Sequence, residues 1–214
     1  MNILTISDTH TLQLNWMRDF PIPKDIDMVI HAGDITNVGR YYEYEDFLIW
    51  FDGLPAKHKI FIAGNHDFGL ENSKRGDLLK LFDSFDVHYL EDSSVEIEGI
   101  KIWGSPVSPP FFNWAFMRDS VNIQKHWEMI PDDVDILVTH TPARGILDFA
   151  IYGNEHTGCP FLLEKIKDIK PKYHIFGHIH EGYGMEKHGE TTFINASVLN
   201  ERYEPANSGF IINI

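Results

Sequence analysis

Five short apolar runs, each followed at once by a polar cluster, constrain the fold of this chain more than any other feature. Their richness in Ile, Val and Phe is typical of strands buried on both faces of a sheet. The runs are Asn2–Ser7, Asp27–His31, His58–Ala63, Asp135–Thr139 and Tyr173–Phe176. In α/β sheets, ligands bind beyond the carboxyl ends of the strands, so we expect the polar clusters to converge on one site.

Further patterns predict the remaining elements. The segment Val95–Trp103 alternates about Glu98-Gly99 and predicts a hairpin, and Thr191–Asn195 and Phe210–Ile214 predict two more strands. Helices are expected at Tyr41–Phe51, Arg75–Phe85, Ser120–Met129 and Phe161–Ile169. Strands and helices alternate at first, and consecutive strands follow. This order favours an α/β fold of the α+β type, in which two packed sheets are flanked by helices, over one open parallel sheet.

Composition narrows the functional classes. A chain of 214 residues with 43% apolar residues fits a single domain, residues 1–214. No secretory or membrane-spanning segment is apparent, so we expect a cytoplasmic protein with no membrane partner. The formal charge of −14 disfavours a long nucleic acid as partner. Cys159 is the only cysteine, which excludes an internal disulfide and suits a reducing compartment.

The polar clusters that follow the five strands hold the residues that carry chemistry. They are Asp8-Thr9-His10, Gly33-Asp34, Gly64-Asn65-His66-Asp67, His140 and Gly177-His178-Ile179-His180. Asp8 and His10 lie two residues apart, as do His178 and His180. Each pair would point the same way if its backbone stays extended.

These clusters offer a mixed set of metal ligands. Carboxylate and imidazole together favour Mn, Fe, Zn or Co over a pure Mg or Ca site. Seven ligands exceed the need of one ion but suit two ions roughly 3.5–4 Å apart. The predicted ligands are Asp8, His10, Asp34, Asn65, His140, His178 and His180. A pair of divalent cations would attract a phosphate ester locally despite the acidic composition.

The ordered motif set resembles that of calcineurin-like metallophosphoesterases between residues 8 and 180. The resemblance implies a four-layer fold, a two-sheet sandwich flanked by helices, and hydrolysis by a metal-bridging hydroxide. It implies that one metal is held by Asp8, His10, Asp34 and His180, and the second by Asp34, Asn65, His140 and His178, with Asp34 as the bridge. Mn is the first candidate for both ions. The resemblance also implies that Asn65 and His66 contact the phosphate, that His66 protonates the leaving oxygen, and that Asp67 orients the His66 ring.

A narrower resemblance covers most of the chain. It runs through Trp114-Ala115-Phe116, Thr139–Pro142, Gly158-Cys159-Pro160, Phe176–Gly184 and Ile194–Ser197. These segments are similar to the metallophosphoesterase-domain-containing proteins, which resemble class III cyclic-nucleotide phosphodiesterases. Some members carry glycine at the position of His178 and are thought to be weakened catalysts. This chain has the histidine, His178, and the resemblance therefore implies a competent enzyme. Asp67 departs from that group, in which glutamate is commoner.

The residues after Gly33-Asp34 separate the candidate activities. Protein phosphatases of this superfamily continue with an aspartate and an arginine, where this chain has Asn37 and Val38. An arginine fork suits a dianionic monoester, so its absence favours a small phosphodiester, with a cyclic nucleotide as the first candidate. The alternatives are a phosphomonoesterase and a non-catalytic binding or scaffold protein. A scaffold would be expected to show eroded motifs, and all seven ligands are present.

Other features allow more than one interpretation. The aromatic segment Pro109–Phe116 could stack a nucleobase, although packing or a subunit contact is favoured, and the oligomeric state stays open. Asn195 is expected beside the metals as a substrate-binding residue, together with Ser197. His31 and His174 lie within apolar runs and are interpreted as core residues.

Overall fold

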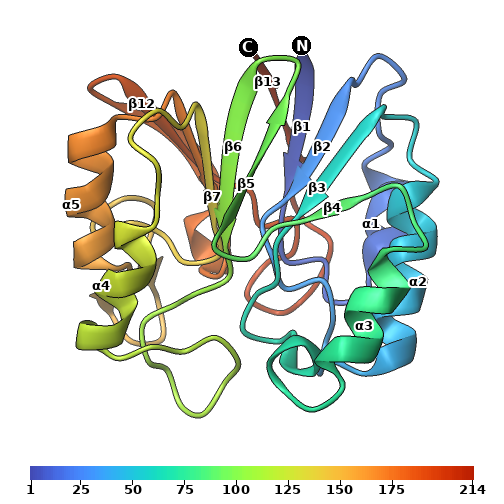
Figure 1. Ribbon diagram of the computed structural model, residues 1–214, viewed down its shortest axis with the longest axis horizontal. Coiled ribbons are helices and arrows are strands. Elements are labelled where there is room, and N and C mark those ends of the chain that lie inside the picture. Colours follow the sequence, from blue (N-terminus) through green and yellow to red (C-terminus); the bar gives the residue numbers. More distant parts are fainter.

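Two main sheets, with helices on both outer faces, make up the computed structural model, which describes residues 1–214 (Figure 1). The first sheet has the order β13-β1-β2-β3-β4. Its strands β1 to β4 are parallel, and β13 pairs antiparallel with β1 at the edge. The bounds are β1 Asn2–Ile6, β2 Met28–His31, β3 His58–Phe61, β4 His88–Tyr89 and β13 Phe210–Asn213.

The second sheet has the order β11-β12-β10-β7-β6-β5. Its four central strands are parallel, and the two edge strands β11 and β5 run antiparallel to their neighbours. The bounds are β5 Ser93–Ile97, β6 Ile100–Ser105, β7 Ile136–Thr139, β10 Tyr173–Phe176, β11 Gly184–His188 and β12 Thr191–Asn195. A separate small hairpin joins β8 (Phe149–Ala150) and β9 (Glu155–His156).

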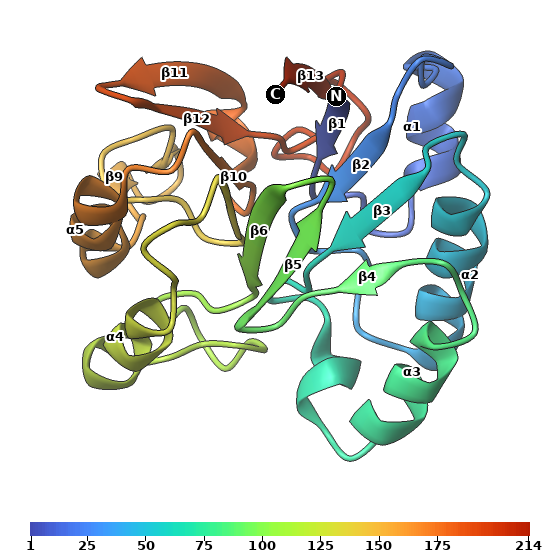
Figure 2. The same cartoon turned by 45° about the horizontal axis from the view of Figure 1, so that its top comes forward.

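Helices cover the outer face of each sheet, as Figures 1 and 2 show. Three lie on the first sheet: α1 Gln13–Asp19, α2 Tyr41–Asp52 and α3 Arg75–Phe82. Two lie on the second sheet, α4 Ser120–Glu128 and α5 Pro160–Ile169. The 3₁₀ turns η1 (Phe68–Glu71) and η2 (His180–Gly182) follow β3 and β10. None of the helices has the length and apolar character needed to span a bilayer.

Three apolar cores separate these layers. Alternate residues of a strand point to opposite faces, so Ile3 packs between the two sheets while Leu4 packs toward α1 and α2. The core between the sheets is built largely from Ile and Val, and the outer core of the first sheet is rich in aromatic rings such as Phe47 and Phe61. A third core lies under α4 and α5. This arrangement confirms the predicted two-sheet sandwich flanked by helices.

The two sheets are joined at the carboxyl ends of their strands. Ser7, just after β1, forms an isolated parallel bridge with Ser197, just after β12. The backbone N–H of Val198 donates to the Ser7 carbonyl at 3.0 Å. The loops that carry the polar clusters therefore meet at one end of the molecule, where both sheets contribute.

Candidate metal centre

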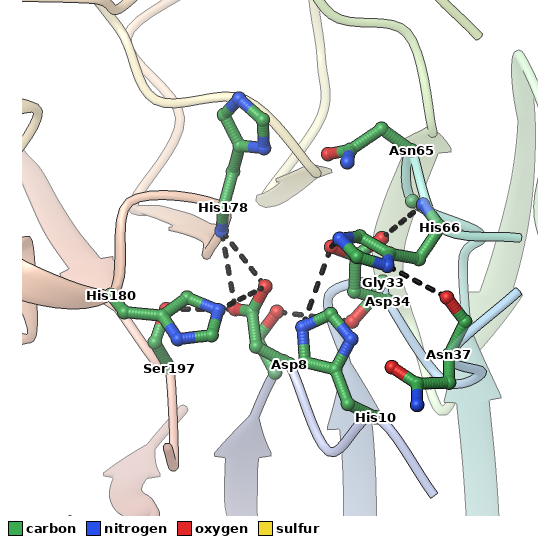
Figure 3. A network of polar contacts seen from close by, with 12 residues as sticks. Asp8, His10, Gly33, Asp34, Asn37, Asn65, His66, His178, His180 and Ser197 are labelled. Carbon is green, nitrogen blue, oxygen red and sulfur yellow. Dashed lines mark hydrogen bonds and ion pairs between the residues drawn. The ribbon is translucent and has the colours of Figure 1, made fainter. Parts of the chain in front are cut away.

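Side chains that follow five strands meet at this junction. Figure 3 labels those that follow β1, β2, β3 and β10. Asp8, Asp34 and Asn65 follow β1, β2 and β3 of the first sheet, whereas His140 and His178 follow β7 and β10 of the second. Donor atoms within 4.8 Å of one another form three groups: Asp8, His10 and His180; Asp34, His140 and His178; and His10, Asp34 and His66. The predicted convergence of distant clusters is therefore present in the fold.

Asp34 occupies the middle of the cluster. Its Oδ2 lies 3.3 Å from Nε2 of His140 and 3.6 Å from Nε2 of His10. Its Oδ1 accepts the backbone N–H of His66 at 2.8 Å. The carboxylate therefore faces candidate ligands from both sheets.

Asp8 is held from several directions at the other side of the site. Its carboxylate accepts the Ser197 hydroxyl at 2.7 Å and the backbone N–H of His178 at 3.1 Å. Its Oδ1 lies 3.5 Å from Nε2 of His180. These bonds fix the orientation of a completely buried carboxylate. Asn65 Oδ1 lies 2.9 Å from His140 Nε2 and adds an amide oxygen on the Asp34 side.

Three imidazoles share one hydrogen-bond pattern. In each ring Nδ1–H donates to a backbone carbonyl, and Nε2 faces a carboxylate. This arrangement is typical of metal-binding histidines, because the second hydrogen bond fixes both tautomer and ring orientation. The pairs are His66 with Asn37 at 2.8 Å, His140 with Ala32 at 2.9 Å and His180 with Asn200 at 2.8 Å.

The His10 ring provides a direct test of whether a metal ion fits. Both of its nitrogens are buried and neither has a hydrogen-bond partner in the protein. An unsatisfied buried polar atom costs about 1–3 kcal/mol, so a protein retains one only where another partner is expected. A divalent cation between His10 and Asp34 would supply a partner for Nε2, which lies 3.6 Å from Asp34 Oδ2. The donor set therefore fits a metal centre.

Burial and mutual charge shift the titration of these groups. Burial alone would raise the pKa of Asp8, but the hydrogen bond and charge of His180 outweigh it and lower that pKa. The pKa of Asp34 is likewise held well below its usual value against burial by the charge of His140. Burial would lower the pKa of His140, yet the Asp34 carboxylate raises it to about 9. The pKa of His180 reaches about 9 in the same way beside Asp8.

The backbone of several candidate metal-binding residues is strained. It is not extended, although an extended conformation was expected just after the strands. Four ligands have left-handed φ angles: Asp8 (57°), His10 (42°), Asp34 (54°) and His178 (69°). Each such non-glycine residue costs about 1–2 kcal/mol. Tight turns, rather than the two-residue period of a strand, therefore aim these side chains at one another. Strain of this kind typically gathers at functional sites.

Two glycines of the motifs allow side chains of the cluster to approach the backbone closely. A Cβ on Gly177 would collide with Asp8 Oδ2 and with the side chain of Ser7. Gly33 has φ +100°, and a Cβ there would lie 2.6 Å from His140 Nδ1. Any larger residue at either position would place its Cβ too close to a neighbouring side chain, so glycine is required at both.

Asp67 does not orient the His66 ring, which corrects the expectation for this residue. Its buried carboxylate accepts the backbone N–H groups of Thr36 at 2.9 Å and Gly64 at 2.7 Å, together with the Thr36 hydroxyl at 2.7 Å. The His66 ring is oriented instead by the Asn37 carbonyl. Asp67 thus braces the loops that carry Asp34 and Asn65, and burial beside Asp34 raises its pKa to about 7.

Asn195 also differs from expectation, because it has no exposed surface for a substrate. Its amide donates to the carbonyls of Leu147 and Ile179, and its Oδ1 accepts the backbone N–H of Ser197 and lies 2.9 Å from the Ser197 hydroxyl oxygen. The same hydroxyl lies within bonding distance of Asp8. Asn195 therefore supports the metal centre from behind rather than facing it.

The aromatic segment Pro109–Phe116 divides into parts with different environments. Ala115 and Phe116 are buried in the outer core of the first sheet. Trp114 is half-buried, and its ring lies edge-on to His66 with 4.3 Å between centroids. Phe111 and Phe112 are exposed. Core packing therefore accounts for Ala115 and Phe116, whereas Trp114 lies at the border of the site.

Sequence reasoning missed several supporting residues. The carbonyl groups of Asn37, Ala32 and Asn200 orient ligand rings, and a backbone carbonyl leaves no signal in a residue pattern. His31 and His174 are buried core residues, as predicted, and each bonds a threonine hydroxyl.

Comparisons with known proteins agree with this geometry. A family model described as calcineurin-like phosphoesterase matches residues 1–182. Metallophosphoesterase domain-containing protein 1 of Homo sapiens is 37% identical over 233 residues, which cover 98% of this chain and 69% of the relative. A UPF0046 protein of Caenorhabditis elegans is also 37% identical, over 94% of this chain and 71% of the relative.

Solved structures show the same fold at low identity. Phosphopantetheinyl hydrolase from Mycobacterium tuberculosis has a TM-score of 0.66 at 16% identity, covering 94% of this chain and 90% of that one. A protein of Thermus thermophilus has a TM-score of 0.62 at 15% identity, covering 91% and 88%. The matched family is one of metal-dependent phosphoric ester hydrolases, and the Asp and His clusters suit that chemistry. The chain belongs to the calcineurin-like phosphoesterase family.

Proposed function

We propose that this protein hydrolyses a small phosphodiester, with a cyclic nucleotide as the first candidate, at a dinuclear metal centre. The observation that carries the proposal is the ligand cluster around Asp34. Donors from both sheets surround the Asp34 carboxylate, and Nε2 of His66 lies 4.0 Å from it. Such a site suits an ester of phosphoric acid, because its oxygens can face the cations while His66 faces an ester oxygen.

Two divalent transition-metal ions, Mn²⁺ foremost and Fe, Zn or Co as alternatives, would supply Lewis acidity and a water of lowered pKa. The residues divide between them by position. Asp8, His10 and His180 gather on one side of Asp34, and Asn65, His140 and His178 on the other. Asp34 would serve both ions.

His66 is placed to act on the substrate. Because its Nδ1–H donates to the Asn37 carbonyl, a proton on Nε2 makes the ring an imidazolium. That Nε2 lies 4.0 Å from Asp34 Oδ2, so it points toward the centre of the cluster. In its protonated form His66 could contact a phosphate oxygen and donate the Nε2 proton to the departing alkoxide, and general-acid help of this kind contributes roughly 10²–10⁴-fold.

The charge distribution supports a diester over a monoester. Only imidazoles pair with the Asp8 and Asp34 carboxylates, and no lysine or arginine does so. The Asn37 and Val38 positions provide no guanidinium fork either. A dianionic monoester gains more from such a fork than a monoanionic diester does.

Initial rates on two nitrophenyl esters test the proposal. The Mn²⁺-loaded protein is expected to hydrolyse bis(4-nitrophenyl) phosphate faster than 4-nitrophenyl phosphate, and a panel of cyclic nucleotides then tests the candidate substrate. A preference for the monoester would support the phosphomonoesterase alternative. Protein that holds its metal but hydrolyses neither ester would support the non-catalytic binding alternative.

A further inference from the structure

One aromatic side chain, contributed by a segment beyond the matched residues 1–182, contacts the candidate metal centre. The ring of Tyr203 lies 4.8 Å from that of His10, 5.1 Å from that of His180 and 6.2 Å from that of His66, measured between centroids. It thus contacts imidazoles from three different loops. No other aromatic side chain outside the histidines reaches as many of them.

The turn that carries Tyr203 is built to hold it there. Asn200 Oδ1 accepts the backbone N–H groups of Arg202 and Glu204, and the Asn200 carbonyl accepts the N–H of Tyr203 at 2.9 Å. The same carbonyl accepts Nδ1–H of His180. One residue therefore fixes both a ligand ring and the position of Tyr203 relative to it.

The backbone conformation of Tyr203 is unfavourable for a bulky residue. Its φ is +60°, in the left-handed region that favours glycine. Four metal ligands share this strained region. Strain retained at such a position indicates a functional constraint on where the side chain points.

Packing alone does not account for the Tyr203 side chain. The residue stays 42% exposed, and its hydroxyl makes no hydrogen bond within the protein. One part of the ring therefore faces the imidazoles while the rest faces solvent. Trp114, from the loop before α4, is a second half-buried ring against His66.

We propose that Tyr203, together with Trp114, binds the organic group that the phosphodiester keeps after cleavage, and so selects substrates in which that group is a planar ring. The inference rests on the proposed function and adds a specificity-determining residue to it. An exposed aromatic face beside the phosphate position can stack a planar group, whereas a methyl group offers little area for contact. Tyr203 is a positioning residue with no part in proton transfer.

Two esters with the same leaving group isolate this contribution. Bis(4-nitrophenyl) phosphate keeps an aromatic ring after cleavage, and methyl 4-nitrophenyl phosphate keeps a methyl group. Tyr203→Ala in the Mn²⁺-loaded protein is expected to reduce the ratio of their kcat/KM values about tenfold, mainly through KM. Tyr203→Phe should retain the wild-type ratio. An unchanged ratio in Tyr203→Ala would overturn the proposal.

Two controls separate selectivity from damage to the site. Metal content of each variant should equal that of wild type, since Tyr203 is not a ligand. Tyr152→Ala removes a tyrosine that is 87% exposed and lies outside the ligand groups, and it should leave the ratio unchanged. Loss of metal from both Tyr203→Ala and Tyr203→Phe would instead show a structural role and contradict the proposal.

Binding of two phosphonates distinguishes this inference from the proposed function. Calorimetry should show that the Mn²⁺-loaded wild type prefers phenylphosphonate to methylphosphonate and that Tyr203→Ala loses the preference. If wild type hydrolyses neither ester but shows this preference, the proposed function fails and the role of Tyr203 stands. Equal binding of the two phosphonates by wild type, or binding of neither, would overturn the role of Tyr203.

Discussion

His140 and His180 are the candidate ligands from which a metal ion would have to displace a proton. Each has a pKa of about 9, because neighbouring carboxylates outweigh burial, so both are protonated at pH 7. Burial lowers the pKa of His10 and of His178 to about 3, and these rings are already neutral. The carboxylates of the site are already ionised.

Metal binding at pH 7 is therefore expected to release about two protons, one from each of the two charged imidazoles. The apparent affinity should rise as pH increases toward 9 and level off above it, because protons then no longer compete. Titration of chelator-stripped protein with Mn²⁺ in two buffers of different ionisation enthalpy measures the number released. Binding without proton release would contradict the charge assignment.

Gly177 sets how closely the backbone approaches Asp8. Gly177→Ala is expected to displace the Asp8 carboxylate and reduce bound metal, because the added Cβ would meet Oδ2. Elemental analysis of the purified variant measures the loss. Gly76→Ala in α3 is the matched control, since nothing lies within 4 Å of the added carbon. The Gly76→Ala variant should keep its metal, and the free energy of unfolding should rise by up to about 1 kcal/mol because alanine favours the helix.

The roles proposed for His66 and Asp34 lead to different phenotypes. His66→Ala should lower kcat by roughly 10²–10⁴-fold with little change in metal content, because the ring acts on the substrate. Asp34→Asn should deplete both ions, because one carboxylate serves both. Elemental analysis and kinetics on the same preparations separate the effects. Similar metal loss in the two variants would refute the division of roles.

The elements expected from sequence are those with long, regular patterns. The five buried runs became β1, β2, β3, β7 and β10, and the Glu98-Gly99 turn does connect β5 and β6. Helix α1 was missed because its seven residues bury only Gln13 and Trp16, which is too little periodicity to recognise. The strands β4, β8 and β9 have two residues each and are defined only by pairing with an adjacent strand, so no sequence pattern predicts them.

The candidate site was predictable where a motif and a strand end coincide. All seven expected ligands lie in the cluster. Asp67 and Asn195 were assigned wrong contacts, because their partners are backbone groups from distant loops that no local pattern specifies. Tyr203 was missed for the same reason, since its approach to His10 depends on a turn at the far end of the chain.

Helix α5 shows the packing on which the second sheet depends. Leu162 is completely buried in the core beneath α4 and α5. Leu162→Ala should lower the free energy of unfolding by about 2–5 kcal/mol, through lost burial and the remaining cavity. Urea denaturation measures the change. Ile49→Ala, at an exposed position of α2, should alter it by less than about 0.5 kcal/mol.

The metal centre connects the two halves of the molecule, so metal should stabilise the whole fold. An ion at a hundredfold excess over its dissociation constant adds about 2.7 kcal/mol, which corresponds to a rise in Tm of about 5–10 °C for a chain of this size. Differential scanning calorimetry with Mn²⁺ and with chelator tests this. His66→Ala should show the same rise, whereas Asp34→Asn should show little.

The bridge between Ser7 and Ser197 has a consequence for the order of events during synthesis. Asp8 leaves the ribosome early, but the hydroxyl that orients its carboxylate and the Asn200 carbonyl that orients His180 are translated almost two hundred residues later. The centre therefore cannot assemble on a nascent polypeptide before most of that polypeptide has been synthesised. The complete centre therefore forms only after Asn200 has been synthesised.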